Sequence, residues 1–221
     1  MLKGIFLDAE GTFLLFNPDL GVIYQRIWES FGIKIDPEIT KRKMRLFFRK
    51  IFKEKLTPPL NGEICKKAWE EVFEKVFEDF KNGAPFEEVF KRAYQFFASP
   101  ECVRVVPGFK EFLIKGKEMG LKFAVISNWD CRLYSILEGH GLLSFFDGVF
   151  IGCEVGYLKP SPEIFKRALE YFNLEPKETV MIGDSLEDDI EVPKALGMHT
   201  YYIKEKPDYY LIWEHLKGYL S

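Results

Sequence analysis

Short apolar runs along the chain alternate with longer segments in which apolar residues recur at helical spacing. The first run, residues 4–7, ends at Asp8 and is followed by Gly11 and Thr12, which is typical of a buried strand that leads into a tight loop. Four later runs have the same character, and they occupy residues 123–126, 149–151, 180–182 and 200–203. The pattern predicts five buried strands.

Helical patterns fill the intervals between these strands. Ser161 followed by Pro162 makes a good N-cap and first helical position, and Gly197 makes a good helix end. The repeated order of strand and helix predicts a parallel sheet with helices on both faces, an α/β fold of three layers with a Rossmann-like core. The helices expected in this part of the chain cover residues 109–119, 161–172 and 186–196.

Residues 17–99 interrupt this alternation. No convincing strand pattern occurs there, and apolar residues at helical spacing fill four segments, residues 23–31, 37–52, 63–80 and 86–97. Helix-breaking pairs separate or end these segments, namely Pro58-Pro59, Asn61-Gly62, Asn82-Gly83 and Ser99-Pro100. We therefore expect a catalytic core of residues 1–16 and 100–221 and an inserted helical cap of residues 17–99. Because both ends of the insert lie near the same sheet edge, it could cover a site there as a lid.

Composition, charge and hydropathy argue against some classes of protein and some kinds of partner. The chain has 221 residues, of which 47% are hydrophobic and 29% charged, with a net charge of −3. A surface of mixed sign offers no broad basic field, so we expect no nucleic-acid partner. No apolar stretch reaches the ~18 residues of a membrane span, and the first apolar run is too short for a signal peptide. We expect a cytoplasmic protein without membrane contact. Abundant Lys and Glu with scarce Gln are typical of a thermophile.

The four cysteines are widely separated in the sequence. They are Cys65, Cys102, Cys131 and Cys153, and no Cys-x-x-Cys pair occurs among them. This spacing predicts neither a disulfide framework nor a zinc site.

Polar residues follow four of the predicted strands at the point where each strand ends. Since the carboxyl ends of parallel strands meet at one edge, where open α/β sheets bind ligands, these side chains are expected to converge. In chain order they are Asp8 and Glu10, then Ser127 and Asn128, then Lys159, then Asp184, Ser185, Asp188 and Asp189.

Each of these residue types has a chemical task in such a site. Crowded carboxylates need a cation, and oxygen ligands favour Mg²⁺, which also offsets charge between an anionic substrate and an anionic nucleophile. A carboxylate nucleophile can form an acyl phosphate, while a second acid protonates the leaving oxygen and then activates water. A hydroxyl, an amide and a Lys ammonium can hold phosphoryl oxygens.

Four motifs occur in order along the chain, each after its own strand. They read Asp8-Ala9-Glu10-Gly11-Thr12, Ile126-Ser127-Asn128, Leu158-Lys159-Pro160-Ser161-Pro162 and Gly183-Asp184-Ser185-Leu186-Glu187-Asp188-Asp189. Together they resemble the motifs of the haloacid dehalogenase-like hydrolase superfamily, in the branch with a helical cap inserted after the first motif. The resemblance extends over nearly the whole chain.

The resemblance implies a role for each motif residue. Asp8 would attack phosphorus and ligate Mg²⁺, and Glu10 stands at the acid/base position, where its backbone carbonyl would also ligate the metal. Thr12 would orient the first loop and belongs to the phosphate-binding set with Ser127, Asn128 and Lys159. Lys159 would bridge Asp8 and the phosphate. Asp184 would complete the metal site, with Asp189 or Asp188 close behind it.

Glu10 departs from the family pattern, because phosphatases of this family mostly carry Asp there and halide-removing members mostly an aromatic residue. Glu10 is then a working acid/base, a poorly placed one, or a residue retuned to another substrate. The favoured function is a Mg²⁺-dependent phosphatase of a small phosphorylated metabolite. The alternatives are a metal-independent haloacid dehalogenase and a weakly active or regulatory member of the family. The substrate and the oligomeric state are left open by the sequence.

Trp129 follows the second motif, and its side chain either lines the substrate pocket or packs in a core or interface. Trp28, Trp69 and the Phe residues of the insert are expected in the core. One or two of these insert residues could instead face the substrate.

Overall fold

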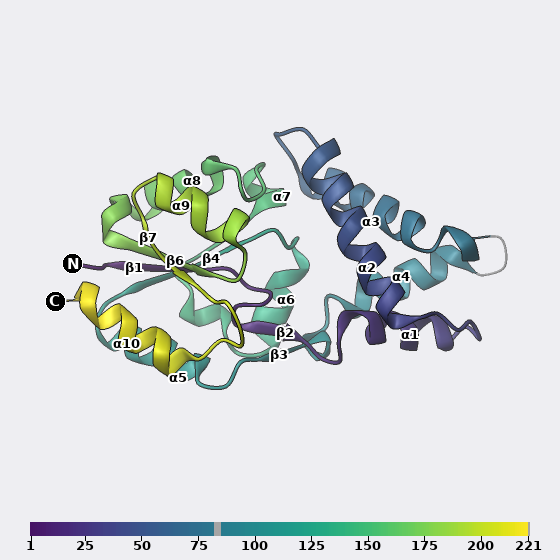
Figure 1. Ribbon diagram of the computed structural model, residues 1–221, viewed down its shortest axis with the longest axis horizontal. Coiled ribbons are helices and arrows are strands. Elements are labelled where there is room, and N and C mark those ends of the chain that lie inside the picture. The colour runs from purple at the N-terminus through teal and green to yellow at the C-terminus, as the bar shows by residue number, and fades with distance from the viewer. Residues whose placement is uncertain (82–84, 221) are drawn as a thin grey trace.

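The computed structural model describes residues 1–81 and 85–220, so the helix break expected at Asn82-Gly83 lies outside the described residues. A five-stranded sheet forms its centre, in the order β5-β4-β1-β6-β7, and all neighbouring strands are parallel. The predicted α/β fold class is confirmed (Figure 1). The strands are β1 Gly4–Leu7, β4 Lys122–Ser127, β5 Gly148–Ile151, β6 Thr179–Gly183 and β7 His199–Tyr202.

Alternation along the strands divides the core into two layers. In β1, Ile5 and Leu7 belong to one cluster of buried apolar residues, whereas Phe6 between them belongs to another. This is the two-residue period of a strand that is buried on both faces. Figure 1 shows α8 and α9 over one face and α5 and α10 over the other. The helices of the sheet region are α5 Phe109–Glu118, α6 Arg132–Gly139, α7 Gly152–Val155, α8 Pro162–Phe172, α9 Val192–Ala195 and α10 Tyr209–Leu220.

One predicted helix start is present in the structure, and another differs. Ser161 is the N-cap of α8, and its hydroxyl accepts a hydrogen bond from the Glu163 amide. The helix expected over residues 186–196 begins instead with a π-helical segment, Leu186–Glu191, before α9. Four of the five residues that follow Leu186 in this segment are acidic, so helical periodicity in the apolar positions alone could not reveal the wider turn.

Residues 17–99, which we call the helical block, form a second body beside the sheet region (Figure 1). Within the described parts of that range, 17–81 and 85–99, every regular element is a helix. Aromatic rings fill the interior of the block, with Trp28 and Phe77 centred 5.0 Å apart and Phe73 and Phe77 4.7 Å apart. The elements are α1 Leu20–Glu29, α2 Pro37–Phe48, the π-helix Arg49–Lys55, α3 Gly62–Val76, the 3-10 helix Glu78–Phe80 and α4 Phe86–Phe96.

A two-stranded ribbon joins the two bodies. β2 (Leu14–Phe16), just before the helical block, pairs antiparallel with β3 (Val103–Val105), just after it. The chain therefore enters and leaves the block side by side. The sequence did not predict this ribbon, because a run of three residues is too short to establish a period.

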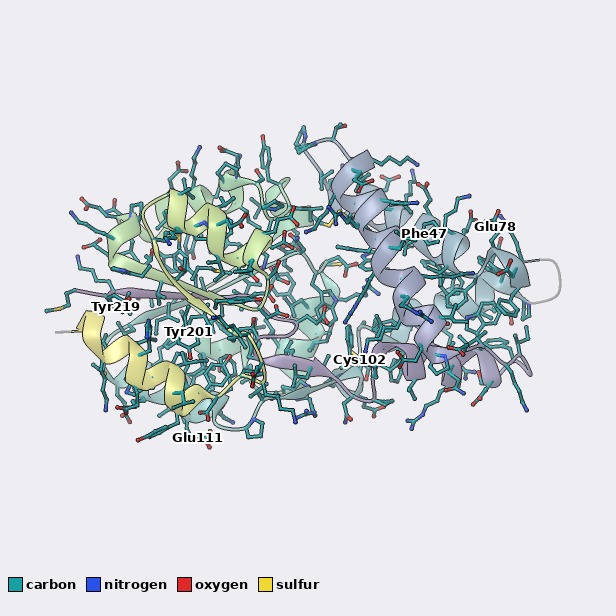
Figure 2. The ribbon with its side chains drawn as sticks, viewed as in Figure 1. Phe47, Glu78, Cys102, Glu111, Tyr201 and Tyr219 are labelled. Atoms are coloured by element: carbon teal, nitrogen blue, oxygen red, sulfur yellow. A yellow bond between two sulfur atoms is a disulfide. The ribbon has the colours of Figure 1, made fainter. Side chains whose placement is uncertain are left out.

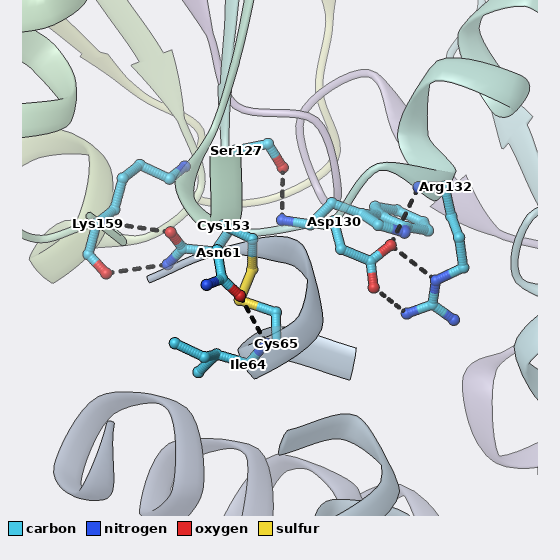
Figure 3. Close-up of a disulfide and its surroundings, with 10 residues drawn as sticks. Asn61, Ile64, Cys65, Ser127, Asp130, Arg132, Cys153 and Lys159 are labelled. Carbon is cyan, nitrogen blue, oxygen red and sulfur yellow. Dashed lines mark hydrogen bonds and ion pairs between the residues drawn. A yellow bond between two sulfur atoms is a disulfide. The ribbon is translucent and has the colours of Figure 1, made fainter. Parts of the chain in front are cut away.

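A disulfide between Cys65 and Cys153 also links the two bodies, with an S–S distance of 2.05 Å (Figure 3). The expectation that the cysteines form no disulfide framework is therefore wrong for Cys65 and Cys153. Cys65 lies on α3 and Cys153 on α7, 88 residues apart in sequence, so only the packing of the block on the sheet region brings them together. Cys102, buried at the junction in Figure 2, and the exposed Cys131 are free.

Two further contacts join the helical block to the sheet region. The Leu60 amide donates to the Gly156 carbonyl at 2.9 Å. Lys53, from the π-helix of the block, pairs with Asp188 at 2.7 Å. Of the helices in the described chain, none has the length and apolar character of a membrane span.

Candidate active site

Asp8 ends β1 at the carboxyl edge of the sheet. Its amide donates to the Ile182 carbonyl at 2.9 Å, which ties the start of the loop to β6. The amides of Phe13 and Leu14 turn back to the Ala9 carbonyl. Gly11, with φ of +83°, makes this tight loop possible, and a Cβ there would overlap the Asp184 carboxylate. The loop thus brings the first and fourth motifs into direct contact.

Lys159 lies buried between two acids. Its Nζ is 2.5 Å from Asp8 Oδ1 and 2.6 Å from Asp189 Oδ1, and only 2% of the residue is exposed. Asn128 fixes the backbone of Lys159, since its side-chain amide donates to the Lys159 carbonyl and its Oδ1 accepts from the Lys159 amide. Asn128 thus holds the third motif in place.

Asp8, Asp184 and Asp189 form one carboxylate cluster. Each offers an oxygen, and these oxygens lie within 4.8 Å of one another, an arrangement that could hold a metal ion. Ser185 supports the cluster through its amide, which donates to Asp189 Oδ2 at 3.1 Å. Asp188 points elsewhere, to Lys53, so of the two neighbouring acids it is Asp189 that joins the cluster.

Burial and mutual repulsion disfavour charge on these acids. Burial, offset in part by Lys159, raises the pKa of Asp8 and of Asp189. Partial loss of bulk water at the site, followed by the charge of Asp189, raises the pKa of Asp184 to about 6. Burial alone would lower the pKa of Lys159, but Asp189 and Asp8 outweigh it and raise the pKa instead. A single ammonium does not neutralise three carboxylates, so the cluster has an excess of negative charge that a divalent cation could balance.

Glu10 opens onto the cavity above the cluster, and its side chain is not one of the three clustered acids. Loss of bulk water within the cavity, followed by the charges of Asp8 and Asp184, raises the pKa of Glu10 to about 7. Arg45 and Lys41 of α2 act in the opposite direction. A carboxyl group with this pKa can both give and take a proton near neutral pH.

The structure brings most of the predicted site residues to one cavity of about 570 Å³ between the sheet region and the helical block. Thr12 does not reach it. The Thr12 side chain is fully buried, and its hydroxyl has no hydrogen-bond partner among the described residues. The predicted site residues that line the cavity are Asp8, Glu10, Ser127, Asn128, Lys159, Asp184 and Asp189.

The chain matches the family model described as haloacid dehalogenase-like hydrolase over residues 2–197. It belongs to this family. The human haloacid dehalogenase-like hydrolase domain-containing protein 3 is 30% identical over 202 residues, which cover 89% of this chain and 79% of that protein. The glyceraldehyde 3-phosphate phosphatase of Pyrococcus abyssi is 35% identical over 108 residues, 46% of this chain and 43% of that enzyme.

The fold of this haloacid dehalogenase-like hydrolase also matches solved structures. The HAD-hydrolase YfnB from Bacillus subtilis, in a structure bound to magnesium, superposes with a TM-score of 0.75. The two share 19% identity, over 91% of this chain and 88% of that one. The family match establishes a hydrolase.

Sequence reasoning missed an ion pair at the cavity wall of this hydrolase. The buried carboxylate of Asp130 binds the Arg132 guanidinium through Nε and Nη2, both at 2.8 Å (Figure 3). The guanidinium in turn lies 4.0 Å from the ring centre of Tyr94 and 5.5 Å from that of Trp69, both in the helical block. The sequence shows Asp130 and Arg132 two residues apart, but it carries no signal for the aromatic partners.

Tyr209, from α10, is a second residue that the sequence did not single out. It is buried, and its hydroxyl donates to the Thr12 carbonyl at 3.0 Å. The first motif loop of this hydrolase is therefore held by the far end of the chain, a contact for which only the fold provides the evidence.

Proposed function

We propose that this hydrolase is a Mg²⁺-dependent phosphatase that acts on a small phosphorylated metabolite through an aspartyl-phosphate intermediate. The carboxylate cluster of Asp8, Asp184 and Asp189 beside Lys159 carries the proposal. Its donors are oxygens, and its charge exceeds what Lys159 neutralises, so the residues fit a hard divalent ion. The named activity of the Pyrococcus abyssi relative, a phosphatase, supports the same reaction class.

Asp8, Asp184 and Asp189 would hold the ion, with the backbone carbonyl of Glu10 as a further ligand. Bound Mg²⁺ would supply positive charge that lets the anionic nucleophile and the phosphoryl group approach each other. Of the two acids left open by the sequence, we propose Asp189 as the ligand, since Asp188 is paired with Lys53.

In the first step, an Asp8 oxygen attacks phosphorus and the ester P–O bond breaks. Glu10 gives its proton to the departing alcohol oxygen, a task that suits its raised pKa of about 7. Lys159, already in contact with Asp8, and the side chains of Ser127 and Asn128 hold the phosphoryl oxygens.

In the second step, water attacks the phosphorus of the acyl phosphate and Glu10 takes the proton of that water. The P–O bond to Asp8 breaks, which releases phosphate and regenerates the carboxylate. We further propose that the helical block acts as the cap that encloses this chemistry, and that Thr12 orients the first loop through the backbone rather than touching phosphate.

A generic aryl phosphate, assayed with Mg²⁺ and with EDTA, tests the proposal. We expect phosphate release that needs Mg²⁺ and falls by at least ~10³-fold in Asp8→Asn, because the covalent route is lost. Halide release from 2-haloacids in EDTA would instead identify a metal-independent dehalogenase. Mg²⁺ binding without either activity would identify a non-catalytic member of the family.

A further inference from the structure

The cavity changes character away from the carboxylate cluster. Six aromatic side chains line it there, and we call them the aromatic lining: Phe16, Tyr24, Phe48, Trp69, Phe97 and Trp129. A phosphate group and two or three carbons need far less space than the cavity of about 570 Å³, whose size falls among pockets that hold drug-sized ligands. The lining therefore faces the part of the substrate that leaves as the alcohol.

The aromatic lining consists of two separate sets. The first set comes from β2, α1, the end of α4 and the loop after β4, and Phe16 is centred 5.8 Å from both Phe97 and Trp129. The second belongs to α2 and α3, with Phe48 and Trp69 centred 5.4 Å apart. In the described chain, no aromatic ring pair connects the two sets. Both sets line the same cavity, and Tyr24, Phe97 and Trp69 also line a second, small pocket together.

The charged groups of this part of the cavity are largely paired within the protein. Lys41 pairs with Asp19, and Arg132 is held by Asp130. Arg45 has no ion-pair partner among residues 1–81 and 85–220, and its charge acts on Asp19 as well as on Glu10. Apart from this one guanidinium, the aromatic lining offers ring surface that suits an apolar planar group.

We propose that the substrate is a phosphate monoester whose alcohol carries a planar aromatic ring of about the size of a nucleobase, which stacks between Trp129 and the Phe48–Trp69 pair. The proposal rests on the phosphatase function proposed above. An aromatic side chain can stack on any base, because every base has a π-face. Stacking therefore favours a substrate with a ring over one without a ring.

Matched substrates with and without a ring test the proposal directly. Uridine 5′-monophosphate and ribose 5-phosphate share the phosphate ester and differ in the base. Likewise, 2-phenylethyl phosphate and ethyl phosphate differ in the ring. We expect kcat/KM to be at least tenfold higher for the ring-bearing member of at least one pair, which corresponds to ~1.4 kcal/mol. Equal or lower values for the ring-bearing member in both pairs would overturn the aromatic substrate and leave the phosphatase standing.

Substitutions in the aromatic lining show which residues cause the preference for ring-bearing substrates. Trp129→Leu and Trp69→Leu should each lower the ratio of kcat/KM between the ring-bearing and ring-free substrates by about fivefold to tenfold. Tyr210→Leu removes an aromatic side chain that is 72% exposed on α10, away from the cavity, and should leave the ratio unchanged. A ratio that does not move in either Trp variant would show that the lining does not contact the ring.

A binding measurement separates this proposal from the catalytic one. Asp8→Asn with Mg²⁺ should bind uridine 5′-monophosphate at least tenfold more tightly than ribose 5-phosphate, with quenching of Trp fluorescence that is lost in the additional Trp129→Leu variant. This result would support stacking of the ring on the aromatic lining even if the wild-type protein released no phosphate. Equal affinities would overturn that stacking whatever the activity.

Discussion

The sheet region and the helical block contribute to the same cavity in different ways. The polar residues of the catalytic end follow strands directly, as Asp8 follows β1 and Asp184 follows β6. The block contributes side chains from helix faces, such as Phe48 and Trp69, whose helices also build its own interior. The candidate catalytic residues are thus located by sheet topology, which local sequence reveals. The aromatic lining is positioned by tertiary packing between the two bodies, which local sequence does not reveal.

Changing Glu10 tests the catalytic half of this comparison most strongly. Glu10→Gln keeps the shape and removes the proton, so we expect kcat to fall by ~10²–10⁴-fold, the usual contribution of a general acid/base. Glu10→Asp, which keeps the carboxyl but shortens its reach, should retain more activity than Glu10→Gln. Measured kcat values for a generic phosphate ester decide the matter, and equal losses in both variants would mean that Glu10 acts through position rather than through its proton.

Gly11 tests whether the first and fourth motifs must touch. In Gly11→Ala, the new Cβ meets the Asp184 carboxylate and the positive φ is strained, so the cluster should shift and kcat/KM should drop by ~10²-fold. Gly120→Ala is the matched control, because Gly120 has φ of +78° but open space around its Cα. It should lose stability and keep activity. Similar activity losses in both variants would point to general strain.

Removing the disulfide tests the contact between the two bodies. Replacing Cys65 and Cys153 together by Ser should lower the free energy of unfolding by about 2–4 kcal/mol, because the unfolded chain gains freedom over a closed loop of 88 residues. Thermal unfolding with and without a reductant measures the change, and Cys131→Ser, at a free cysteine, should unfold like wild type. If reductant did not destabilise the wild type, the link would not constrain the unfolded chain.

Lys53 should produce the smallest effect. Its ammonium joins the block to Asp188 of the sheet region, both partners being mostly buried. Lys53→Met should raise KM a few-fold, as expected for the loss of about 1 kcal/mol from a partly buried pair. Lys55→Met is the control from the same π-helix, because Lys55 pairs with Glu71 inside the block. A larger effect at Lys55 would place the sensitivity within the block rather than between the bodies.

The fold could be predicted from the sequence wherever a strand or helix has a recognisable sequence pattern of its own. The five strands were found within one or two residues because each is a buried apolar run with a turn behind it. The helices α6, α7 and α10 were not predicted. α7 spans only Gly152–Val155, and α10, rich in Tyr and Trp, lacks a clear start signal beyond Asp208, whose carboxylate accepts from the Tyr210 and Leu211 amides.

The candidate site, too, could be predicted from the sequence only in part. That Asp8 and Asp184 approach each other follows from the rule for parallel sheets, since both end neighbouring strands. The choice of Asp189 over Asp188 did not follow, because it depends on the π-helical turn and on Lys53 from a distant segment. The stacking of Arg132 on Tyr94 likewise depends on how the bodies pack.

The paired ribbon and the disulfide have a mechanical consequence. The ribbon of β2 and β3 gathers both chain crossings at one place, and the Cys65–Cys153 bond adds a second, separate attachment at α7. Separation of the helical block from the sheet region would have to leave the ribbon and the disulfide intact while breaking the Lys53–Asp188 ion pair and the bond from the Leu60 amide to the Gly156 carbonyl. Reduction of the disulfide removes one of the two covalent restraints on that separation.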